Sequence, residues 1–360
     1  MHVVVGGDIG GAERVVADLA TRPEPTGADH QVALFTPNRA LASYFVRAGL
    51  RVHDRGQVRE NPLAYLYRSL GPVDVHWLSA LLVAEASDVV HTHTFGSHVL
   101  GTRAARRTGK PQLRSEHHVM HYFDPTCSPF TRWAAARTAR FVAVSEYVRR
   151  VVTETAPRLA SRMSVVRNGV DTHHFAPRES REPRPDTPLR LAVVCRLTAW
   201  KRVHLAVEAA ALARCELVVV GDGEERARLE ELAKERHAEV RFVGYQADPR
   251  PHVAACDAVL NTADSEPLGL SVLEALSMAR PVIAFAAGGI PEIVENERTG
   301  FLVPEATAVA LARAIEQARA DRVALVRMGH DGRRFVLEQC SIERMCEGYA
   351  VAYAAAAGRS

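Results

Sequence analysis

The stretch Thr262-Ala-Asp-Ser-Glu-Pro-Leu-Gly-Leu-Ser-Val-Leu-Glu274 combines a tight turn with the start of a helix. The short apolar segment 257–261 before it is typical of a buried strand in a parallel sheet, and residues 270–278 after it carry leucines at helical spacing. Pro267 keeps the residue before it out of the right-handed helical region, and Gly269 permits close approach of the backbone to a ligand. The first amides of the helix have no partner within it, so this end attracts phosphate.

Two carboxylates flank that anion site, Glu266 on the turn and Glu274 in the helix. Neither would bind phosphate by charge, so we expect both to accept hydrogen bonds from hydroxyl groups. A ligand with phosphates in its middle and hydroxyls at both ends is a nucleotide sugar. An ordinary strand–turn–helix with two solvated glutamates is the alternative, and the stretch alone does not decide between them.

Length and composition favour a globular protein of two domains. The chain has 360 residues, 47% of them hydrophobic and 24% charged. A net charge of +3 is too small to indicate a nucleic-acid partner, and no apolar run reaches the length of a membrane span. Six cysteines stand singly, which predicts reduced thiols in a cytoplasmic protein.

Strand and helix patterns alternate along both halves of the chain, which predicts α/β domains with doubly wound parallel sheets. We expect strands at 3–5, 31–36, 88–91, 112–115, 141–144, 164–166, 189–195, 216–220, 240–243, 257–261, 281–285 and 301–303. Helices are expected at 11–20, 39–48, 62–70, 73–86, 96–108, 130–139, 145–155, 203–213, 224–235, 270–278, 307–320 and 323–337.

The segment 176–188 contains four prolines, alternating charges and no apolar period, as an exposed linker does. It divides the chain into a first domain at 1–175 and a second at 189–341, followed by a last helix at about 342–356. Ligands of such domains bind at the carboxyl ends of the strands, so a site is expected there.

Glu266 and Glu274 stand in the spacing E-x7-E, which resembles the signature of glycosyltransferase family 4, a family of retaining enzymes with the GT-B fold. The resemblance implies two Rossmann-like domains facing across a cleft, with the last helix crossing back to the first domain. It also implies that Glu266 contacts the donor sugar and that Glu274 binds the ribose. The backbone of Leu268, Gly269 and Leu270 would then hold sugar and phosphate.

Arg196-Leu-Thr-Ala-Trp-Lys201 follows the expected strand 189–195 and resembles the G-R-L…K-G motif of that family. The resemblance implies that Arg196 and Lys201 grip the donor pyrophosphate. This chain departs from the motif at Cys195 and Arg202, where the family has glycine, but neither change removes a cation. Fixed cations stabilise a leaving diphosphate, so no metal and no other cofactor is expected.

The first half carries further matches. Gly10-Gly11-Ala-Glu13 resembles the family's G-G-A-E, whose glycine loop faces donor phosphates and acceptor. Ser115-Glu116-His117 is similar to its T-x-H, which makes His117 the site histidine near the transferring sugar, although a shift of one position would select His118. Without the family, a tight turn and a structural histidine explain these residues as well.

The remaining matches concern capping, turns and the nucleotide base. Ser145-Glu146 resembles the S-E that opens a helix, and 168–175 resembles N-G-V-D…F, with a structural role. Gly221-Asp-Gly223 is similar to the family's G-x-G, and Tyr245 and Gln246 fall in the segment that lines the base pocket in relatives. The matching segments 288–292 and 299–303 are interpreted as architectural.

Groups of histidines and of basic residues suggest two further kinds of site, one for a metal and one for an anionic partner. His91-x-His93 and the group His117, His118 and His121 suggest a metal, but no carboxylate or thiol completes a known spacing, and we predict none. A basic stripe on one expected helix would meet an acidic lipid surface or an anionic acceptor, or is simply a solvated face; its members are Arg103, Arg106, Arg107 and Lys110.

The sequence therefore predicts a metal-independent, retaining glycosyltransferase. Its donor is a UDP-sugar in preference to a GDP-sugar, it transfers a hexose or N-acetylhexosamine, and its acceptor is a glycan, a glycolipid or a small metabolite. Catalytic roles fall to His117, Glu266, Arg196 and Lys201, and donor binding to Gly10, Gly11, Arg196, Lys201, Gly221, Tyr245, Gln246, Leu268, Gly269, Leu270 and Glu274. The location is cytoplasmic, with peripheral contact to the inner membrane face left open.

Two alternatives remain. A nucleotide-sugar epimerase of the same fold would use the same donor site, and incubation of the donor without acceptor separates it from a transferase. A non-catalytic binding subunit would require ruined site residues, and each of the expected ones is present.

Overall fold

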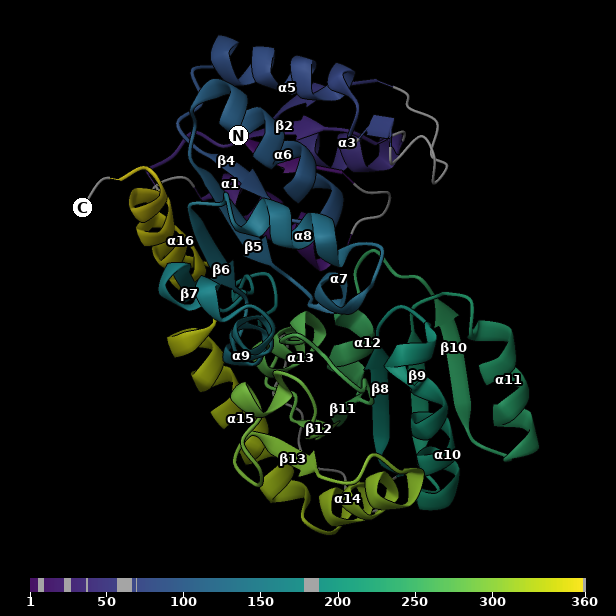
Figure 1. The fold of residues 1–360 in the computed structure, drawn as a ribbon. Coiled ribbons are helices and arrows are strands. Elements are labelled where there is room, and N and C mark those ends of the chain that lie inside the picture. The colour runs from purple at the N-terminus through teal and green to yellow at the C-terminus, as the bar shows by residue number, and fades with distance from the viewer. Residues whose placement is uncertain are drawn as a thin grey trace. The chain divides into compact units, whose positions relative to one another are not determined.

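The computed structural model describes residues 1–5, 10–22, 27–36, 38–56, 67–68, 70–177 and 188–358. The chain forms two compact units: Met1–Asn168 with Ile342–Ser360 is unit 1, and Gly169–Ser341 is unit 2. Each unit is built on one parallel sheet with helices on both faces (Figure 1).

Unit 1 contains a seven-stranded sheet in the order β3-β2-β1-β4-β5-β6-β7, with every pair parallel. The order reverses between β1 and β4, because the chain first builds outward to β3 and then continues on the other side. The strands are β1 (His2–Val4), β2 (Gln31–Leu34), β3 (Arg51–Asp54), β4 (Val90–Thr92), β5 (Gln112–Glu116), β6 (Arg140–Ala143) and β7 (Met163–Val165).

Helices cover the two faces of this sheet with separate apolar clusters. One face packs against α5 and α6 through Val3, Leu78 and Leu100, and the other against α1 and α3 through Val4 and Phe45. The unit's helices are α1 (Gly11–Thr21), α3 (Arg39–Arg47), α5 (Pro72–Ala84), α6 (Phe95–Thr108), α7 (Met120–Phe123), α8 (Ser128–Ala135), α9 (Glu146–Thr155), η1 (Pro157–Arg162) and α16 (Ile342–Ala356).

The last helix of the chain, α16, completes the second of these faces. In Figure 1 this helix runs beside β6. Its fully buried Cys346 and Tyr349 pack with Leu113 of β5, Val142 of β6 and Leu19 of α1. This helix is apolar on the side that meets the sheet, so its removal would expose the middle strands of unit 1.

Unit 2 contains a six-stranded parallel sheet in the order β10-β9-β8-β11-β12-β13. The strands are β8 (Arg190–Val194), β9 (Glu216–Val220), β10 (Val240–Gly244), β11 (Ala258–Asn261), β12 (Val282–Phe285) and β13 (Gly300–Val303). The helices are η2 (Ala199–Lys201), α10 (Val203–Ala213), α11 (Arg226–Glu235), α12 (Arg250–Ala255), α13 (Leu270–Ser277), η3 (Ile290–Glu292), α14 (Ala308–Ala320) and α15 (Arg322–Gln339). One face packs on α10 and α14 and the other on α13 and α15.

The expected strands and most expected helices are present within a few residues of their predicted ends. Among the described residues, six short elements were not expected: β3, α7, α12 and the 3₁₀ helices η1, η2 and η3. Residues 169–175, assigned from sequence to the first domain, belong to unit 2, because Val170 and Phe175 pack in its core. Most of the expected helix 62–70 and the linker residues 178–187 lie outside the described residues.

Ser145 caps α9 as predicted, since its Oγ accepts a hydrogen bond from the amide of Val148 at 3.1 Å. Among the described residues, no helix is both long enough and apolar enough to cross a bilayer.

Two glycines let α15 approach α13, and they generate a stability prediction. A Cβ at Gly329 would lie 2.2 Å from the carbonyl oxygen of Ala279, whereas one at Gly332 would meet only side-chain carbons of Leu276. Although alanine favours helix by up to about 1 kcal/mol over glycine, Gly329→Ala should lower the free energy of unfolding of unit 2 by about 1–3 kcal/mol through overpacking. Gly332→Ala, the matched control, should lower the free energy of unfolding by less than Gly329→Ala does.

Trp200 provides the measurement, because the other two tryptophans, Trp77 and Trp133, lie in unit 1. In a Trp77→Phe, Trp133→Phe background, urea unfolding followed by Trp200 fluorescence reports unit 2. A Gly329→Ala variant as stable as its parent would show that α15 does not approach the backbone of Ala279 this closely.

Candidate functional site

The sheet of unit 2 reverses its strand order between β8 and β11. In open α/β sheets, ligands bind outside the carboxyl ends of the strands at such a reversal. Lys201 lies on the segment that follows β8, and Glu266 on the segment that follows β11. The fold therefore brings the two residues, which the sequence analysis treated separately, to the same place.

Lys201 and Glu266 form an ion pair between Nζ and Oε2. Their side chains are only 13% and 11% exposed, so the pair is largely shielded from water. Lys201 also lies over the ring of Trp200, with Nζ 4.1 Å from the ring centroid, a cation–π contact. This pairing could not be predicted from the sequence, since the partners are 65 positions apart in the chain.

Hydrogen bonds to main-chain carbonyls join the two loops that carry the pair. Thr262 Oγ1 donates to the carbonyl of Lys201 at 2.8 Å, and the amide of Asp264 donates to the carbonyl of Trp200 at 3.2 Å. These bonds fix the separation of the segments that follow β8 and β11, and with it the distance over which a ligand would be held.

A pair of glycines supports Glu266 from the other side. The amide of Gly289 donates to the carbonyl of Glu266 at 2.7 Å, and a Cβ at Gly288 would lie 2.1 Å from that oxygen. Gly288 also has φ of +62°, a conformation that other residues rarely adopt. The segment 288–292, interpreted as architectural, therefore sets the position of a site residue.

Helix α13 begins at Leu270, shortly after Glu266. Gly269 is its N-cap in a left-handed conformation with φ of +98°, and Leu268 beside it is buried. The amides of Leu270 and Ser271, in the first turn, have no carbonyl of the helix to bond with, so they offer donors to an anion. Glu274 is buried on the next turn of the helix.

Arg196 lies at the carboxyl end of β8 and is exposed. Within the described part of the chain it has no ion-pair partner, unlike Lys201, so its cation is directed to solvent. The loop after β9, which contains Gly221 and Asp222, packs against the backbone on either side of Arg196. The amide of Leu197 donates to the carbonyl of Asp222 at 2.9 Å. A Cβ at Gly221 would lie 1.8 Å from the carbonyl oxygen of Cys195. Packing of the backbone thus explains the glycine at 221 without a ligand.

Tyr245 and Gln246 follow β10 at the far edge of the same end of the sheet. Tyr245 is 72% exposed, and Gln246 Nε2 donates to the carbonyl of Val243 at 2.9 Å. Their position is therefore open to a ligand, but the structure joins neither residue to the Lys201–Glu266 pair.

In unit 1, Gly11 is the first residue of α1 and Gly10 its N-cap. The amide of Gly10 donates to Oε2 of Glu13 at 3.0 Å, so the glutamate of the G-G-A-E motif caps the helix. The preceding glycine-loop residues 6–9 lie outside the described part of the chain.

His117 follows β5 and is half-buried, and its Nε2 lies 3.1 Å from Nδ1 of His93. Burial, with the positive charge of Arg114 nearby, lowers the pKa of His117 to about 3, so the imidazole is neutral near pH 7. His118 is exposed and contacts the ring of His121 edge-on. Of the two candidate histidines, His117 is the one that the fold holds in a polar network.

Glu116 directly precedes His117 in the sequence, but its side chain belongs to a different cluster. It is fully buried and accepts from Arg114 at 3.0 Å and from Tyr122 at 2.9 Å. Burial alone would raise the pKa of Glu116, but the Arg114 guanidinium holds it well below the usual range. Since successive strand residues face opposite sides, this carboxylate is not directed toward His117.

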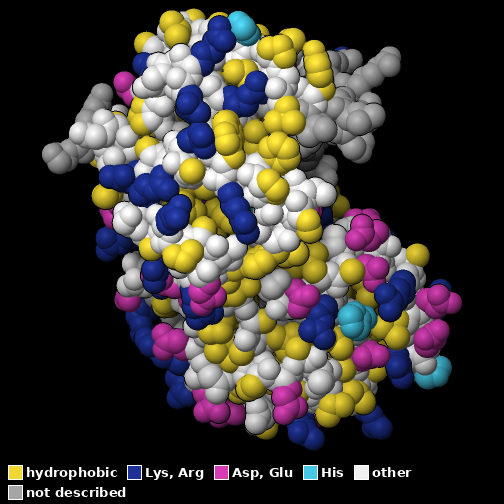
Figure 2. All heavy atoms as spheres, viewed as in Figure 1, with side chains coloured by type: hydrophobic (Ala, Val, Ile, Leu, Met, Phe, Trp, Pro, Cys, Tyr) yellow, Lys and Arg dark blue, Asp and Glu magenta, His cyan; other side chains and the backbone are white. Residues whose placement is uncertain are grey.

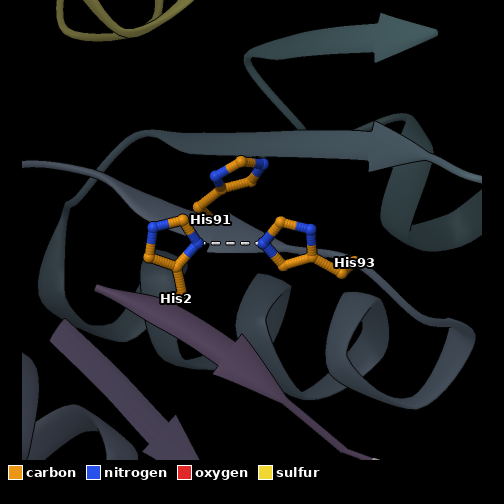
Figure 3. A group of neighbouring side chains, drawn as sticks. All are labelled: His2, His91 and His93. Carbon is orange, nitrogen blue, oxygen red and sulfur yellow. Dashed lines mark hydrogen bonds between the residues drawn. The ribbon is translucent and has the colours of Figure 1, made fainter. Parts of the chain in front are cut away.

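Three buried histidines, His2, His91 and His93, lie with ring nitrogens within 4.8 Å of one another (Figure 3). His2 and His91 are register partners on β1 and β4, which places them on one face of the sheet. His91 and His93 were singled out from the sequence, but His2 was not. The available signal was a histidine directly before the expected apolar strand 3–5.

Every ring nitrogen of these three histidines has a protein partner. His2 bonds His93 at 3.0 Å and His30 at 2.9 Å, and His93 also bonds His117. His91 bonds Ser115 and Tyr353, both at 2.8 Å. A metal ion would have to displace these bonds, so the arrangement fits a hydrogen-bond network better than a coordination site.

The basic stripe predicted on α6 is partly engaged within unit 1. Arg103 donates to the carbonyl of Gly71 at 2.9 Å, and Arg107 lies 2.9 Å from Nε2 of His76. Figure 2 shows Lys and Arg side chains over the helices of unit 1, with few acidic side chains between them. The surface is cationic, but two of the four predicted residues also have structural contacts.

Comparison with known proteins accounts for both halves of the chain. Residues 9–174 match the family model Glycosyltransferase Family 4, and residues 177–335 match Glycosyl transferases group 1. The chain is 35% identical over 170 residues to the lipopolysaccharide core biosynthesis glycosyltransferase LpsE of Rhizobium meliloti (strain 1021), covering 46% of this chain and 50% of that protein. It is 28% identical over 312 residues to alpha-maltose-1-phosphate synthase of Mycolicibacterium smegmatis, covering 73% and 78%.

Among solved structures, Anabaena HepE in complex with UDP and glucose superimposes with a TM-score of 0.82 at 22% identity, covering 97% of both chains. With two Rossmann-like units and these matches, the protein is a glycosyltransferase of the GT-B class. Its halves correspond to the Glycosyltransferase Family 4 and Glycosyl transferases group 1 models in that order. The relatives named here do not favour the epimerase alternative.

The Lys201–Glu266 pair generates a stability prediction. Lys201→Met or Glu266→Gln alone should lower the free energy of unfolding of unit 2 by about 1–3 kcal/mol, because each leaves the other partner shielded and less well paired. The double variant should recover part of this loss, with a coupling energy of about 0.5–3 kcal/mol measured in a double-mutant cycle.

An exposed pair of the same unit provides the control. Arg298 and Glu295 are 54% and 45% exposed, so Arg298→Ala should change stability by only about 0–1 kcal/mol. Additive single effects at Lys201 and Glu266 would contradict the pairing.

Proposed function

We propose that the protein is a retaining glycosyltransferase that moves a hexose or an N-acetylhexosamine from a UDP-sugar to an acceptor hydroxyl. The observation that carries this proposal is the Lys201–Glu266 pair at the strand reversal of unit 2. It places a cation and a carboxylate beside the open end of α13, and a diphosphate-linked sugar needs both kinds of group.

The cations act on the leaving group. Breaking the bond between sugar and diphosphate increases negative charge on the phosphate oxygens, so fixed positive charges stabilise the transition state more than the bound substrate. Lys201 is held in position by Glu266 and Trp200, and Arg196 is exposed at the end of β8. With two such cations and the amides of α13, the reaction requires no divalent metal.

Glu266 positions the sugar rather than attacking it. One carboxylate oxygen, Oε2, is engaged by Lys201, while Oε1 has no hydrogen-bond partner within the described residues and is suited to accept a sugar hydroxyl. Retention then follows from attack on the face that the diphosphate leaves, through an ion-pair-like transition state in which the leaving phosphate helps to deprotonate the acceptor. Glu274 accepts from the ribose hydroxyls, and the backbone at Tyr245 and Gln246 contacts the base.

The donor and acceptor classes rest on the relatives. HepE, of the same fold, is described in complex with UDP and glucose, which favours UDP over GDP and a hexose over other sugars. LpsE acts in lipopolysaccharide core biosynthesis, which favours a glycan or glycolipid acceptor over a small metabolite. We assign acceptor binding to unit 1, with Gly10 and Gly11 facing the donor phosphates and the acceptor, and His117 near the transferring sugar and the acceptor hydroxyl. We also assign peripheral contact with an anionic membrane to the cationic α6 surface.

Kinetics of site variants test the assigned roles. Arg196→Ala and Lys201→Ala should each lower kcat by on the order of 10²–10³, the cost typical of removing one transition-state donor. Glu274→Ala should mainly raise the KM for the donor, because ribose hydroxyls are bound equally in ground and transition states. Arg298→Ala is the control with unchanged rates. Full turnover in both cation variants, or activity that is abolished by EDTA and restored by a divalent ion, would contradict the assignment.

A thermal-shift screen tests the base. Ligand that binds only the folded protein raises Tm in proportion to its occupancy, so UDP and UDP-sugars should raise Tm more than GDP, ADP or dTDP and their sugars at equal concentration. Glu274→Ala should reduce the shift. A larger shift with GDP would replace UDP by GDP without affecting the transferase class.

A further inference from the structure

Four imidazoles of unit 1 are hydrogen-bonded in series. His30 Nδ1 lies 2.9 Å from His2 Nε2, His2 Nδ1 lies 3.0 Å from His93 Nε2, and His93 Nδ1 lies 3.1 Å from His117 Nε2. The middle bond is the one drawn in Figure 3. The chain ends at the histidine to which the proposed function gives a role near the acceptor.

All three bonds have the same sense, because each joins Nδ1 of one ring to Nε2 of the next. A neutral imidazole has one nitrogen that donates and one that accepts. The direction of one bond therefore fixes the direction of the others, and the series has two states. In one state every ring carries its proton on Nε2, and in the other every ring carries it on Nδ1.

The series runs diagonally across the sheet, from the amino ends of β2 and β1 to the carboxyl ends of β4 and β5. His30 precedes β2 and His2 stands at the start of β1, whereas His93 and His117 follow the carboxyl ends of β4 and β5. His2 and His93 are buried, and His30 is half-buried beside the exposed Asp29. Helix α16 covers the path, with the ring of Tyr353 centred 5.6 Å from that of His30. The interior rings are thus shielded from water, and one end lies near the surface.

The rings are neutral near pH 7. Burial lowers the pKa values of His2 and His93 well below the usual range, and it lowers that of His30 to about 4. A neutral series passes a proton by exchanging tautomers, without placing a charge in the interior.

We propose that His117, His93, His2 and His30 form a proton relay between the carboxyl edge of the unit 1 sheet and the surface at His30. This inference rests on the proposed function, in which the acceptor hydroxyl loses its proton when its oxygen bonds to the sugar. With the leaving phosphate assisting, that proton is transferred to Nδ1 of His117, and each ring passes its Nε2 proton to Nδ1 of the next until His30 releases its Nε2 proton to solvent. In the reverse sequence His30 takes a proton from solvent on Nε2 and His117 gives its Nδ1 proton to the released nucleoside diphosphate, which restores the first state.

Substitutions along the series test the relay. His93→Gln, which breaks it, and His30→Ala, which removes its outer end, should lower kcat by about 10- to 100-fold, within what proton transfer contributes to catalysis, and leave the KM of both substrates unchanged. Imidazole added to the buffer should restore turnover of His30→Ala in proportion to its concentration, because it replaces the outermost ring.

His91 provides the matched control. It is as buried as His2, and its ring lies tilted beside those of His2 and His93, but its nitrogens bond Ser115 and Tyr353, outside the series. His91→Gln should therefore keep kcat near that of the parent. Equal losses in His91→Gln and His93→Gln, or a His30→Ala variant with full turnover or without imidazole rescue, would overturn the relay and leave a structural cluster.

Nuclear magnetic resonance of the protein with ¹⁵N-labelled histidines tests the series without any activity. Scalar coupling between nitrogens across each of the three bonds is the expected result, and a missing coupling would overturn the relay. So would a stoichiometric divalent metal in the purified protein that is lost in His2→Gln, since a coordinated nitrogen cannot pass a proton. If the couplings are present but the parent transfers no sugar to any acceptor, the proposed function fails while the series stands.

Discussion

The ion pair between Lys201 and Glu266 is the interaction on which the site of unit 2 depends. It joins the segments after β8 and β11. The Thr262 hydroxyl donates to the carbonyl of Lys201, and the Gly289 amide donates to the carbonyl of Glu266, so the backbone of each partner is also held. Removing two charges from water costs as much as their attraction returns, so such a pair contributes little net stability. Its position at the strand reversal therefore argues for a role in binding, where a fixed cation and an oriented carboxylate act on the same ligand.

Much of the fold could be predicted because its strands are runs of apolar residues, as in Val282–Phe285, and helices separate them. Strand β3, Arg51-Val-His-Asp54, was missed because it has a single aliphatic residue and lies at the sheet edge, where burial does not select apolar side chains. Helix α7 has four residues, too few for a 3.6-residue period to show. Phe175 was placed in the wrong unit because a turn motif predicts where the chain bends and not which core receives the following side chain.

The candidate site residues could be predicted individually but not their partners. Glu266 and Gly269 stand in one stretch whose local chemistry is visible, whereas Lys201 and Glu266 are separated by 65 positions and His2 and His93 by 91. Side-chain pairing over such distances depends on strand order and register, which a single sequence does not contain. One signal was nevertheless available: a buried polar side chain needs a partner. Histidines at alternate positions within apolar strands therefore predict one another on the same face.

The site of unit 2 contains ionised side chains, whereas the α16 face of unit 1 contains neutral ones. The difference in burial explains this contrast. Unit 2 keeps ionised groups at its site and pairs or exposes them, as Lys201 and Arg196 show. On the α16 face of unit 1, burial lowers the pKa of His91 and raises that of Tyr353, so each stays neutral. A diphosphate leaving group is stabilised by fixed positive charges. A hydroxyl that loses a proton instead needs neutral groups that accept one proton and donate another without becoming charged. Helix α16 shields this face of unit 1 from water. The packing of the last helix on unit 1 therefore helps to keep these histidines and tyrosines neutral.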